Sequence, residues 1–229
     1  MKVLQPHRWR ACPPELQRRR AFSLFECLVV AAVAAMVAVI GLLLLKPGRN
    51  FDKFTACNIR CVNNLKGLGT AFRVWAGDHN DKYPMTVSVT NGGSMELLAT
   101  GNVTACFQVM SNALPTPEIL YCPGDDRHQV AVGFDGLGRA NLSYFISLDA
   151  AETDPQAVLS GDANLVQNGR AVASGILNLK TNIITWTQNR HMRHGNVLFC
   201  DGAVDSVRRM GLTNFDGETY NPTNKVVIP

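Results

Sequence analysis

The residues of this chain that are best suited to chemistry lie in its C-terminal half. His191 and His194 are three positions apart, and nine residues separate His191 from the dipeptide Asp201-Gly202. Together with Asp162, these imidazole and carboxylate groups are of the types that form metal sites or acid–base pairs. The alternative is that His191 hydrogen-bonds the turn at Asp201-Gly202 and fixes the edge of a hairpin.

Two features of the sequence weigh against a metal or catalytic centre. Arg190 and Arg193 stand among these histidines, and their positive charge opposes the binding of a cation. The chain also lacks the G-x-S-x-G, G-x-x-x-x-G-K-[ST] and H-E-x-x-H patterns of hydrolases, nucleotide-binding loops and zinc proteases. We therefore expect no enzyme activity, no cofactor and no metal, and we expect His191 to hold the hairpin turn.

A second polar cluster, Asp78, Asn80 and Asp81, has the oxygen ligands that calcium prefers. The cluster lacks the downstream glutamate that completes an EF-hand loop. The sequence favours an ordinary turn over a calcium site.

Five of the seven cysteines lie beyond the N-terminal apolar segment, so in an oxidising compartment at least one of them stays unpaired or joins another chain. Cys57 and Cys61 are four residues apart in an expected helix and would form a strained bridge. Cys122 can pair with either Cys61 or Cys106, and the sequence leaves both pairings open. No cysteine spacing matches a zinc motif.

An apolar segment near the N-terminus contains no charged residue and no proline between Cys27 and Leu45. At about 1.5 Å per residue it forms roughly 28 Å of helix, enough to cross a hydrocarbon core of about 30 Å. The segment is preceded directly by Glu26. A carboxylate at the edge of a membrane-spanning helix is costly, which predicts a compensating positive charge.

The net charge of the chain is concentrated ahead of this segment. Six lysines and arginines against one glutamate give residues 1–21 a charge of +5, so the remainder carries −1 of the total of +4. Basic flanks stay cytoplasmic, which places the N-terminus inside. A nearly neutral remainder gives no reason to expect nucleic-acid binding.

Three arginines at 18–20, then Ala21, Phe22 and a glutamate at the fifth place counted from Phe22, resemble the prepilin processing signal of type IV pilins and type II secretion pseudopilins. The resemblance implies that a prepilin peptidase cuts between Ala21 and Phe22 and that the new N-terminus is methylated. The exposed ammonium of Phe22 would then pair with Glu26 of a neighbouring subunit and direct assembly.

Apolar residues spaced by three and four predict an amphipathic helix over about residues 50–76, which continues the membrane helix after a break at Lys46-Pro47-Gly48. Gly67 and Gly69 would let a sheet approach this helix closely. Residues 95–99 and 105–111 indicate short helical turns. Alternation and β-branched residues predict strands at 85–89, 129–134, 142–148, 157–160 and 182–187. Asp201-Gly202 predicts a hairpin with a two-residue turn.

Two further stretches resemble pseudopilin-like proteins that carry a C-terminal H-x9-DG region. Cys61-x-x-Asn64-Leu65-Lys66 is followed by a polar loop that ends in Tyr83-Pro84. His191, Asp201 and Gly202 match the H-x9-DG motif itself, to which the family label attaches no activity.

Together these observations predict a pilin-like α+β protein: a leader at 1–21, a transmembrane helix at 22–46, its amphipathic continuation at 47–76, and an α+β head at 77–229 built on an antiparallel sheet. The resemblance implies a pseudopilin in the inner membrane, its head in the periplasm, with prepilin peptidase/methyltransferase and other pilin or pseudopilin subunits as partners. The alternative is an adhesive or ligand-binding head on a prepilin-type anchor.

Overall fold

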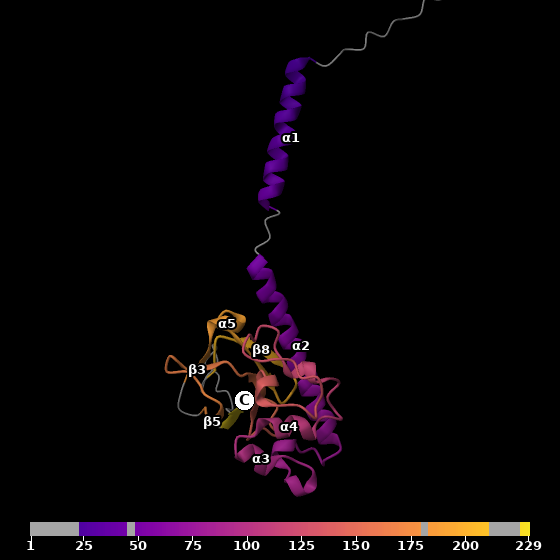
Figure 1. Ribbon diagram of the computed structural model, residues 1–229, viewed down its shortest axis with the longest axis vertical. Helices are drawn as coiled ribbons and strands as arrows, with labels where there is room; N and C mark the ends of the chain where they lie inside the picture. Colours follow the sequence, from indigo (N-terminus) through magenta and orange to yellow (C-terminus); the bar gives the residue numbers. More distant parts are fainter. Residues whose placement is uncertain (1–22, 45–48, 180–182, 211–224) are drawn as a thin grey trace, which may run out of the picture. The chain divides into compact units, whose positions relative to one another are not determined.

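The computed structural model describes residues 23–44, 49–179, 183–210 and 225–229 (Figure 1). The chain divides into two compact units, Met1–Pro47 and Gly48–Pro229. The leader, Ala21, Phe22 and the predicted break at residues 46–48 lie outside the described residues.

The described part of the first unit is one helix, α1 (Leu24–Leu44). Its apolar part, Leu24–Leu42, is long and apolar enough to cross a membrane. Glu26 accepts a hydrogen bond from the backbone N–H of Ser23 (2.9 Å), and the Ser23 hydroxyl accepts one from the N–H of Glu26 (3.2 Å). This reciprocal pair is a capping box, which satisfies donors that the first turn of a helix leaves free.

In the second unit, α2 (Arg49–Gly77) confirms the predicted amphipathic helix. Its apolar stripe becomes fully buried from Cys61 to Trp75. One predicted close approach is also present. A Cβ atom on Gly69 would lie 3.0 Å from Leu198, whereas Gly67 has only an ordinary contact with Ile119 at 3.8 Å. Glycine at position 69 therefore lets α2 lie directly on the sheet.

The strands of the described residues form two sheets in which every pairing is antiparallel. The larger sheet has the order β5-β10-β1-β2-β7-β8, and the smaller has the order β4-β3-β6-β9. The strands of the larger sheet are β1 (Tyr144–Ser147), β2 (Val158–Asp162), β5 (Gly175–Asn178), β7 (Gly195–Phe199), β8 (Val204–Val207) and β10 (Lys225–Ile228). Those of the smaller sheet are β3 (Leu165–Gln167), β4 (Arg170–Ala171), β6 (Ile184–Trp186) and β9 (Arg209–Met210).

The larger sheet is buried on both faces in its centre. Along β7, Leu198 joins the apolar cluster that includes the stripe of α2, while Val197 and Phe199 join a second cluster with residues of the smaller sheet such as Trp186. Because successive side chains of a strand point to opposite faces, the segment Val197–Phe199 between the two layers is apolar throughout. The head is thus layered as helix, six-stranded sheet and four-stranded sheet.

The structure confirms the predicted strands at 142–148, 157–160 and 182–187 as β1, β2 and β6, and the helical turns at 95–99 and 105–111 as α3 (Met95–Ala99) and α4 (Val103–Val109). Strands β3, β4, β5, β9 and β10 were not predicted. The remaining short helices are η1 (Pro84–Thr86), η2 (Val89–Asn91), η3 (Pro117–Leu120), η4 (Arg139–Asn141) and α5 (Gln188–His191).

Two predicted strands are wrong. Residues 85–89 form parts of η1 and η2, because Pro84 begins the first helix and the Ser88 hydroxyl caps the second by accepting from the N–H of Thr90. Residues 129–134 form no strand. Their β-branched side chains Val130 and Val132 are exposed, so no buried face selects a strand there.

The β7–β8 hairpin confirms the predicted pairing but corrects its turn. Phe199 and Ala203 close a three-residue loop of Cys200, Asp201 and Gly202 instead of a two-residue one. Gly202 has φ +86°, the left-handed conformation that ends such a loop and that favours glycine. The α+β class with antiparallel sheets is therefore confirmed.

Candidate functional site

Buried polar side chains inside the head surround a disulfide between Cys61 of α2 and Cys122, which follows η3. Their Cα atoms are 5.4 Å apart. Of the two pairings that the sequence left open, the structure contains this one, and Cys106 is a buried free thiol in α4. Burial raises the pKa of the Cys106 thiol to about 12, so it stays protonated.

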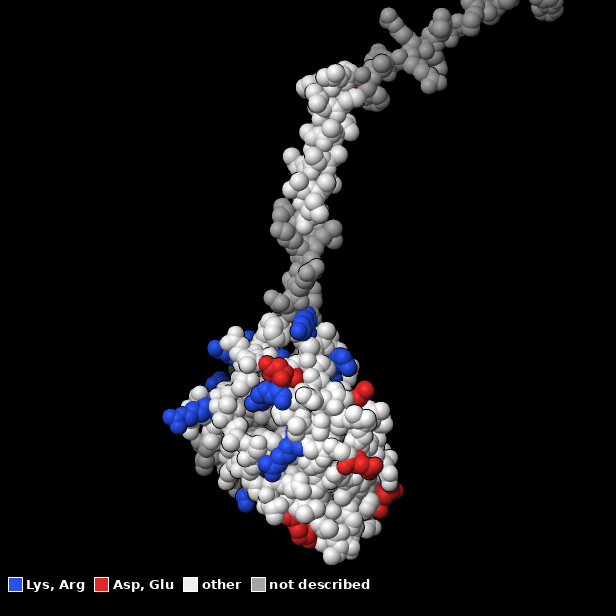
Figure 2. Space-filling model, viewed as in Figure 1, with Lys and Arg blue, Asp and Glu red and all other residues white. Residues whose placement is uncertain are grey.

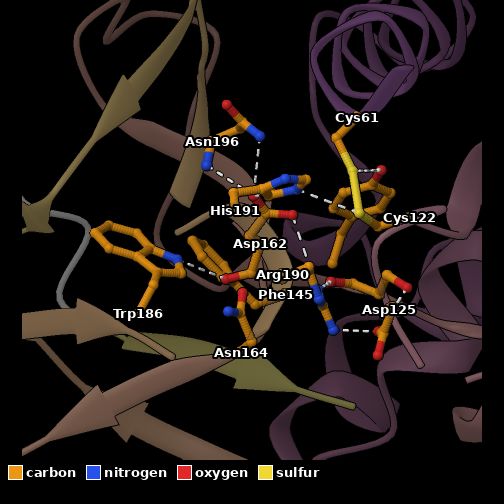
Figure 3. A network of polar contacts seen from close by, with 12 residues as sticks. Cys61, Cys122, Asp125, Phe145, Asp162, Asn164, Trp186, Arg190, His191 and Asn196 are labelled. Carbon is orange, nitrogen blue, oxygen red and sulfur yellow. Dashed lines mark hydrogen bonds and ion pairs between the residues drawn. A yellow bond between two sulfur atoms is a disulfide. The ribbon is translucent and has the colours of Figure 1, made fainter. Parts of the chain in front are cut away.

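His191 lies against this disulfide and not at the hairpin turn. Its Nε2 is 3.3 Å from Cys122 Sγ and 3.6 Å from Asp162 Oδ2 (Figure 3). At about 3.3 Å per residue, the strand β7 separates His191 from the Asp201 turn by roughly 16 Å. The expectation that His191 hydrogen-bonds the turn is therefore wrong, and Asp201 instead accepts from the N–H of Ala203.

The H-x9-DG spacing nevertheless has a physical explanation, because both ends of β7 are held by α2. At one end His191 meets the disulfide that begins at Cys61. At the other end Arg73 donates to the carbonyl of Cys200 (3.2 Å), and a Cβ atom on Gly202 would lie 3.1 Å from the Arg73 guanidinium. The residues between His191 and Asp201 thus include the whole of β7, and the motif marks the two ends at which this strand is joined to α2.

Asp162, at the end of β2, is fully buried and is the predicted partner that does reach His191. Its Oδ2 accepts from the backbone N–H of Asn196 (2.8 Å) and from the Asn196 side-chain amide (3.1 Å). Its carbonyl accepts from Trp186 Nε1 (3.1 Å). These three donors fix the orientation of Asp162 beside the disulfide.

A buried arginine extends the network away from the sulfur atoms. Arg190 is 2% exposed and forms an ion pair with Asp125. Its Nη1 donates to the carbonyl of Ser143 (2.8 Å) and lies 3.8 Å from Asp162 Oδ1. Asp125 also accepts from the Ser143 hydroxyl (2.8 Å) and pairs with His128 (2.6 Å), so most of the charge of Arg190 is balanced locally.

Burial sets the protonation of the His191–Asp162 pair. It lowers the pKa of His191 below its usual value, against the attraction of Asp162, and it raises the pKa of Asp162 against the charges of His191 and Arg190. Near neutral pH we take His191 to be the neutral imidazole, the form that can act as a ligand or as a proton acceptor.

Protonation of Asp125 in acid is expected to lower the free energy of unfolding of the head by about 2 kcal/mol. Burial alone would raise the pKa of this carboxyl, but the hydrogen bond with His128 and the charge of Arg190 lower it from 3.8 to about 2. A group with a lowered pKa stabilises the fold fully above its unfolded pKa and loses that contribution as the pH falls through its folded pKa, here between about 4 and 2.

Urea unfolding between pH 5 and 2 measures this contribution. The substitution Asp125→Asn should remove the part of the pH dependence that belongs to this carboxyl. The neighbouring Asp126 is exposed, so Asp126→Asn is the matched control and should leave it in place. Equal pH profiles for the two variants would contradict the assignment.

The remaining predicted site residues are placed elsewhere. His194 is half-buried, and its ring contacts Arg208 Nε (3.0 Å) and the Met192 carbonyl (3.3 Å) rather than His191. Asp78, Asn80 and Asp81 lie in the turn that ends α2, where the Asp81 N–H donates to Ala76. The predicted turn is confirmed.

A pocket of about 240 Å³ opens beside the cluster. Its lining residues are Phe54, Thr55, Asn58, His191, Met192, His194 and Ser206. Asn58 also accepts from the side-chain amide of Asn196 (2.9 Å), so the pocket wall is joined to the network around Asp162. His191 therefore stands between the pocket and the disulfide.

Sequence reasoning missed Asn196 and Asp125 and the meeting of His191 with the sulfur atoms. These residues come from segments that are far apart in the chain, and no short motif joins them. Comparison of the chain with protein-family models, with curated proteins and with solved structures finds no match.

Proposed function

We propose that this chain is a pseudopilin-like structural subunit, which a prepilin peptidase processes and which then assembles into a filament of the type II secretion or type IV pilus kind. The observation that carries the proposal is α1. Its side chains from residue 24 to residue 40 are exposed, and Glu26 is the single charged residue among them. On the face that Figure 2 shows, this helix is covered almost entirely by uncharged side chains, drawn in white.

The position of Glu26 supports a role in assembly. Lipid tails are as apolar as leucine, so an apolar helix gains little free energy by packing leucine against other helices in a membrane. A lone carboxylate at the start of such a helix is costly until it is paired, so it favours contact with a subunit that offers a positive charge. The capping box turns this carboxylate back toward residue 23. A cut after Ala21 would create the ammonium of residue 22 one peptide unit from Ser23, at nearly the same membrane depth as Glu26 of a neighbouring subunit.

The head fits the same proposal. The disulfide between Cys61 and Cys122 favours an oxidising compartment, which agrees with an N-terminus in the cytoplasm and a head on the periplasmic side. The amphipathic α2 lies on an antiparallel sheet, which is the coarse layout expected of a pilin-like head.

Mass spectrometry of the native N-terminus tests the proposal. The expected mature chain begins at a methylated Phe22. The variant Ala21→Leu should block the cut and leave a precursor about 2 kDa heavier, given 25.0 kDa for 229 residues. A native chain that starts at Met1, or a variant that migrates like the wild type, would contradict processing. Mature chains that never enter filaments would instead indicate an anchored head that does not assemble.

A further inference from the structure

Four potential metal ligands from four segments converge beside the pocket. Cys61 comes from α2, Cys122 from the loop after η3, Asp162 from the end of β2 and His191 from the end of α5. One ligand atom of each lies within 4.8 Å of the others, and all four residues are buried. Figure 3 shows His191 and Asp162 beside the bonded sulfur atoms.

Two sulfurs, one imidazole nitrogen and one carboxylate oxygen form a ligand set that suits tetrahedral zinc. We propose that reduction of the Cys61–Cys122 disulfide converts this cluster into a zinc site that holds one Zn²⁺ through Cys61, Cys122, Asp162 and His191. The site is independent of filament assembly and adds a second, redox-controlled way of joining α2 to the sheet.

The distances between the groups agree with this site. At the usual zinc–ligand distances of about 2.0–2.3 Å, the ligand atoms of a tetrahedral site are separated by roughly 3.3–3.8 Å. His191 Nε2 is already 3.3 Å from Cys122 Sγ and 3.6 Å from Asp162 Oδ2. Once the sulfur–sulfur bond is broken, the two sulfurs need to move apart to about 3.8 Å, which side-chain rotation can supply.

Charge balance also favours an ion in the reduced state. Two thiolates and one carboxylate around Zn²⁺ leave a net charge of −1, and Arg190 lies 3.8 Å from Asp162 Oδ1. Arg190 is paired mainly with Asp125, so its charge does not prevent a cation from binding beside Asp162. Arg193 is exposed and donates to Gln188, away from the cluster.

Groups around the ligands are arranged as outer partners of a metal site usually are. Asn196 holds Asp162 Oδ2 with two hydrogen bonds, and the Tyr144 hydroxyl donates to Cys61 Sγ (3.4 Å). Such outer contacts fix ligand orientation. These outer contacts hold Asp162 and Cys61, whereas His191 Nδ1 has no hydrogen-bond partner among the described residues. The pocket beside His191 gives an ion a route of entry.

The redox step is balanced by an external dithiol. That dithiol gives two electrons and two protons to the Cys61–Cys122 bond and is itself oxidised to a disulfide. Zinc then displaces the protons of the two new thiols, and its own oxidation state does not change.

The test uses the full-length chain in detergent, reduced with dithiothreitol, freed of the reductant without oxygen and titrated with Co²⁺ as a coloured substitute for zinc. The expected result is a sulfur-to-cobalt charge-transfer band with tetrahedral d–d bands, saturating at one ion per chain and displaced by Zn²⁺. The oxidised chain should give neither band.

Matched variants assign the ligands. The substitution Cys122→Ser removes one of the two thiolates and should at least halve the charge-transfer band, and His191→Ala should weaken cobalt binding by more than roughly tenfold. The controls Cys57→Ser and His194→Ala change a cysteine one helical turn from Cys61 and a histidine three residues from His191, neither of which belongs to the cluster, so they should bind like the wild type.

Two outcomes would overturn the proposal. The first is a reduced wild-type chain that keeps its helical circular dichroism and shows no charge-transfer band, a result that needs no variant to fold. The second is cobalt binding that survives in His191→Ala and is lost in His194→Ala, which would place the ion in the pocket instead.

Discussion

Replacing both Cys61 and Cys122 with serine is expected to lower the free energy of unfolding of the head by about 4 kcal/mol. The bond joins residues separated by 61 positions. In the chain-entropy account, opening so long a loop raises the conformational entropy of the unfolded chain, and this lowers the free energy of unfolding by about 4 kcal/mol. Denaturant unfolding followed by tryptophan fluorescence measures the change, because Trp75 and Trp186 are both buried in the head.

Reduction provides the control for this prediction. Dithiothreitol should destabilise the wild type by nearly the same amount and leave the double variant unchanged when metal ions are absent. The variant Cys57→Ser alters a free, half-buried cysteine one helical turn from Cys61 and should respond to dithiothreitol like the wild type. A wild type that is insensitive to reduction would refute a stabilising disulfide.

Replacing Glu26 with alanine is expected to reduce incorporation into filaments on the order of a thousandfold. Two opposite unit charges about 4 Å apart attract by on the order of 4 kcal/mol at an effective dielectric constant of about 20. The variant would leave the ammonium of residue 22 without its partner in lipid. Recovery of the chain in sheared filaments, together with the other subunits, measures the effect.

The capping box makes it possible to separate charge from helix capping. Glutamine at position 26 can still accept from the Ser23 N–H, so Glu26→Gln keeps the cap and removes the charge. Conversely, Ser23→Ala removes one half of the capping box and keeps the charge. We expect Glu26→Gln to fail in assembly like Glu26→Ala and Ser23→Ala to assemble. The reverse pattern would show that the glutamate serves only the helix.

Elements with a single, repeated pattern could be predicted from the sequence. The stripe that runs from Phe54 to Trp75 predicted α2, because three- and four-residue spacing is specific to a helix with one buried face. The hairpin followed from Asp201-Gly202 between two apolar runs. Its turn type did not, because Asp-Gly also suits a three-residue loop with glycine in the left-handed position.

Short strands and the polar cluster were harder to predict, for one physical reason. Strands such as β3 and β9 have only three and two residues, too few for alternation to stand out, and they form by pairing with β6. The sequence offers Asp162 as a partner of His191, but the spacing of the cysteines gives no sign that Cys61 and Cys122 join them. Contacts between residues far apart in the chain decide where the short strands pair and which side chains form the polar cluster, and a single sequence does not display such contacts.

The place of β10 in the larger sheet bears on how the head is made. Lys225–Ile228 lies between β5 and β1 and pairs with both. While the ribosome is still adding the preceding residues, β1 and β5 each present an unpaired edge, and open edges invite pairing with other chains. The sheet can close only after Lys225–Ile228 has emerged from the ribosome, so β1 and β5 wait for a strand that lies far behind them in the chain and depend on protection of the nascent chain until then.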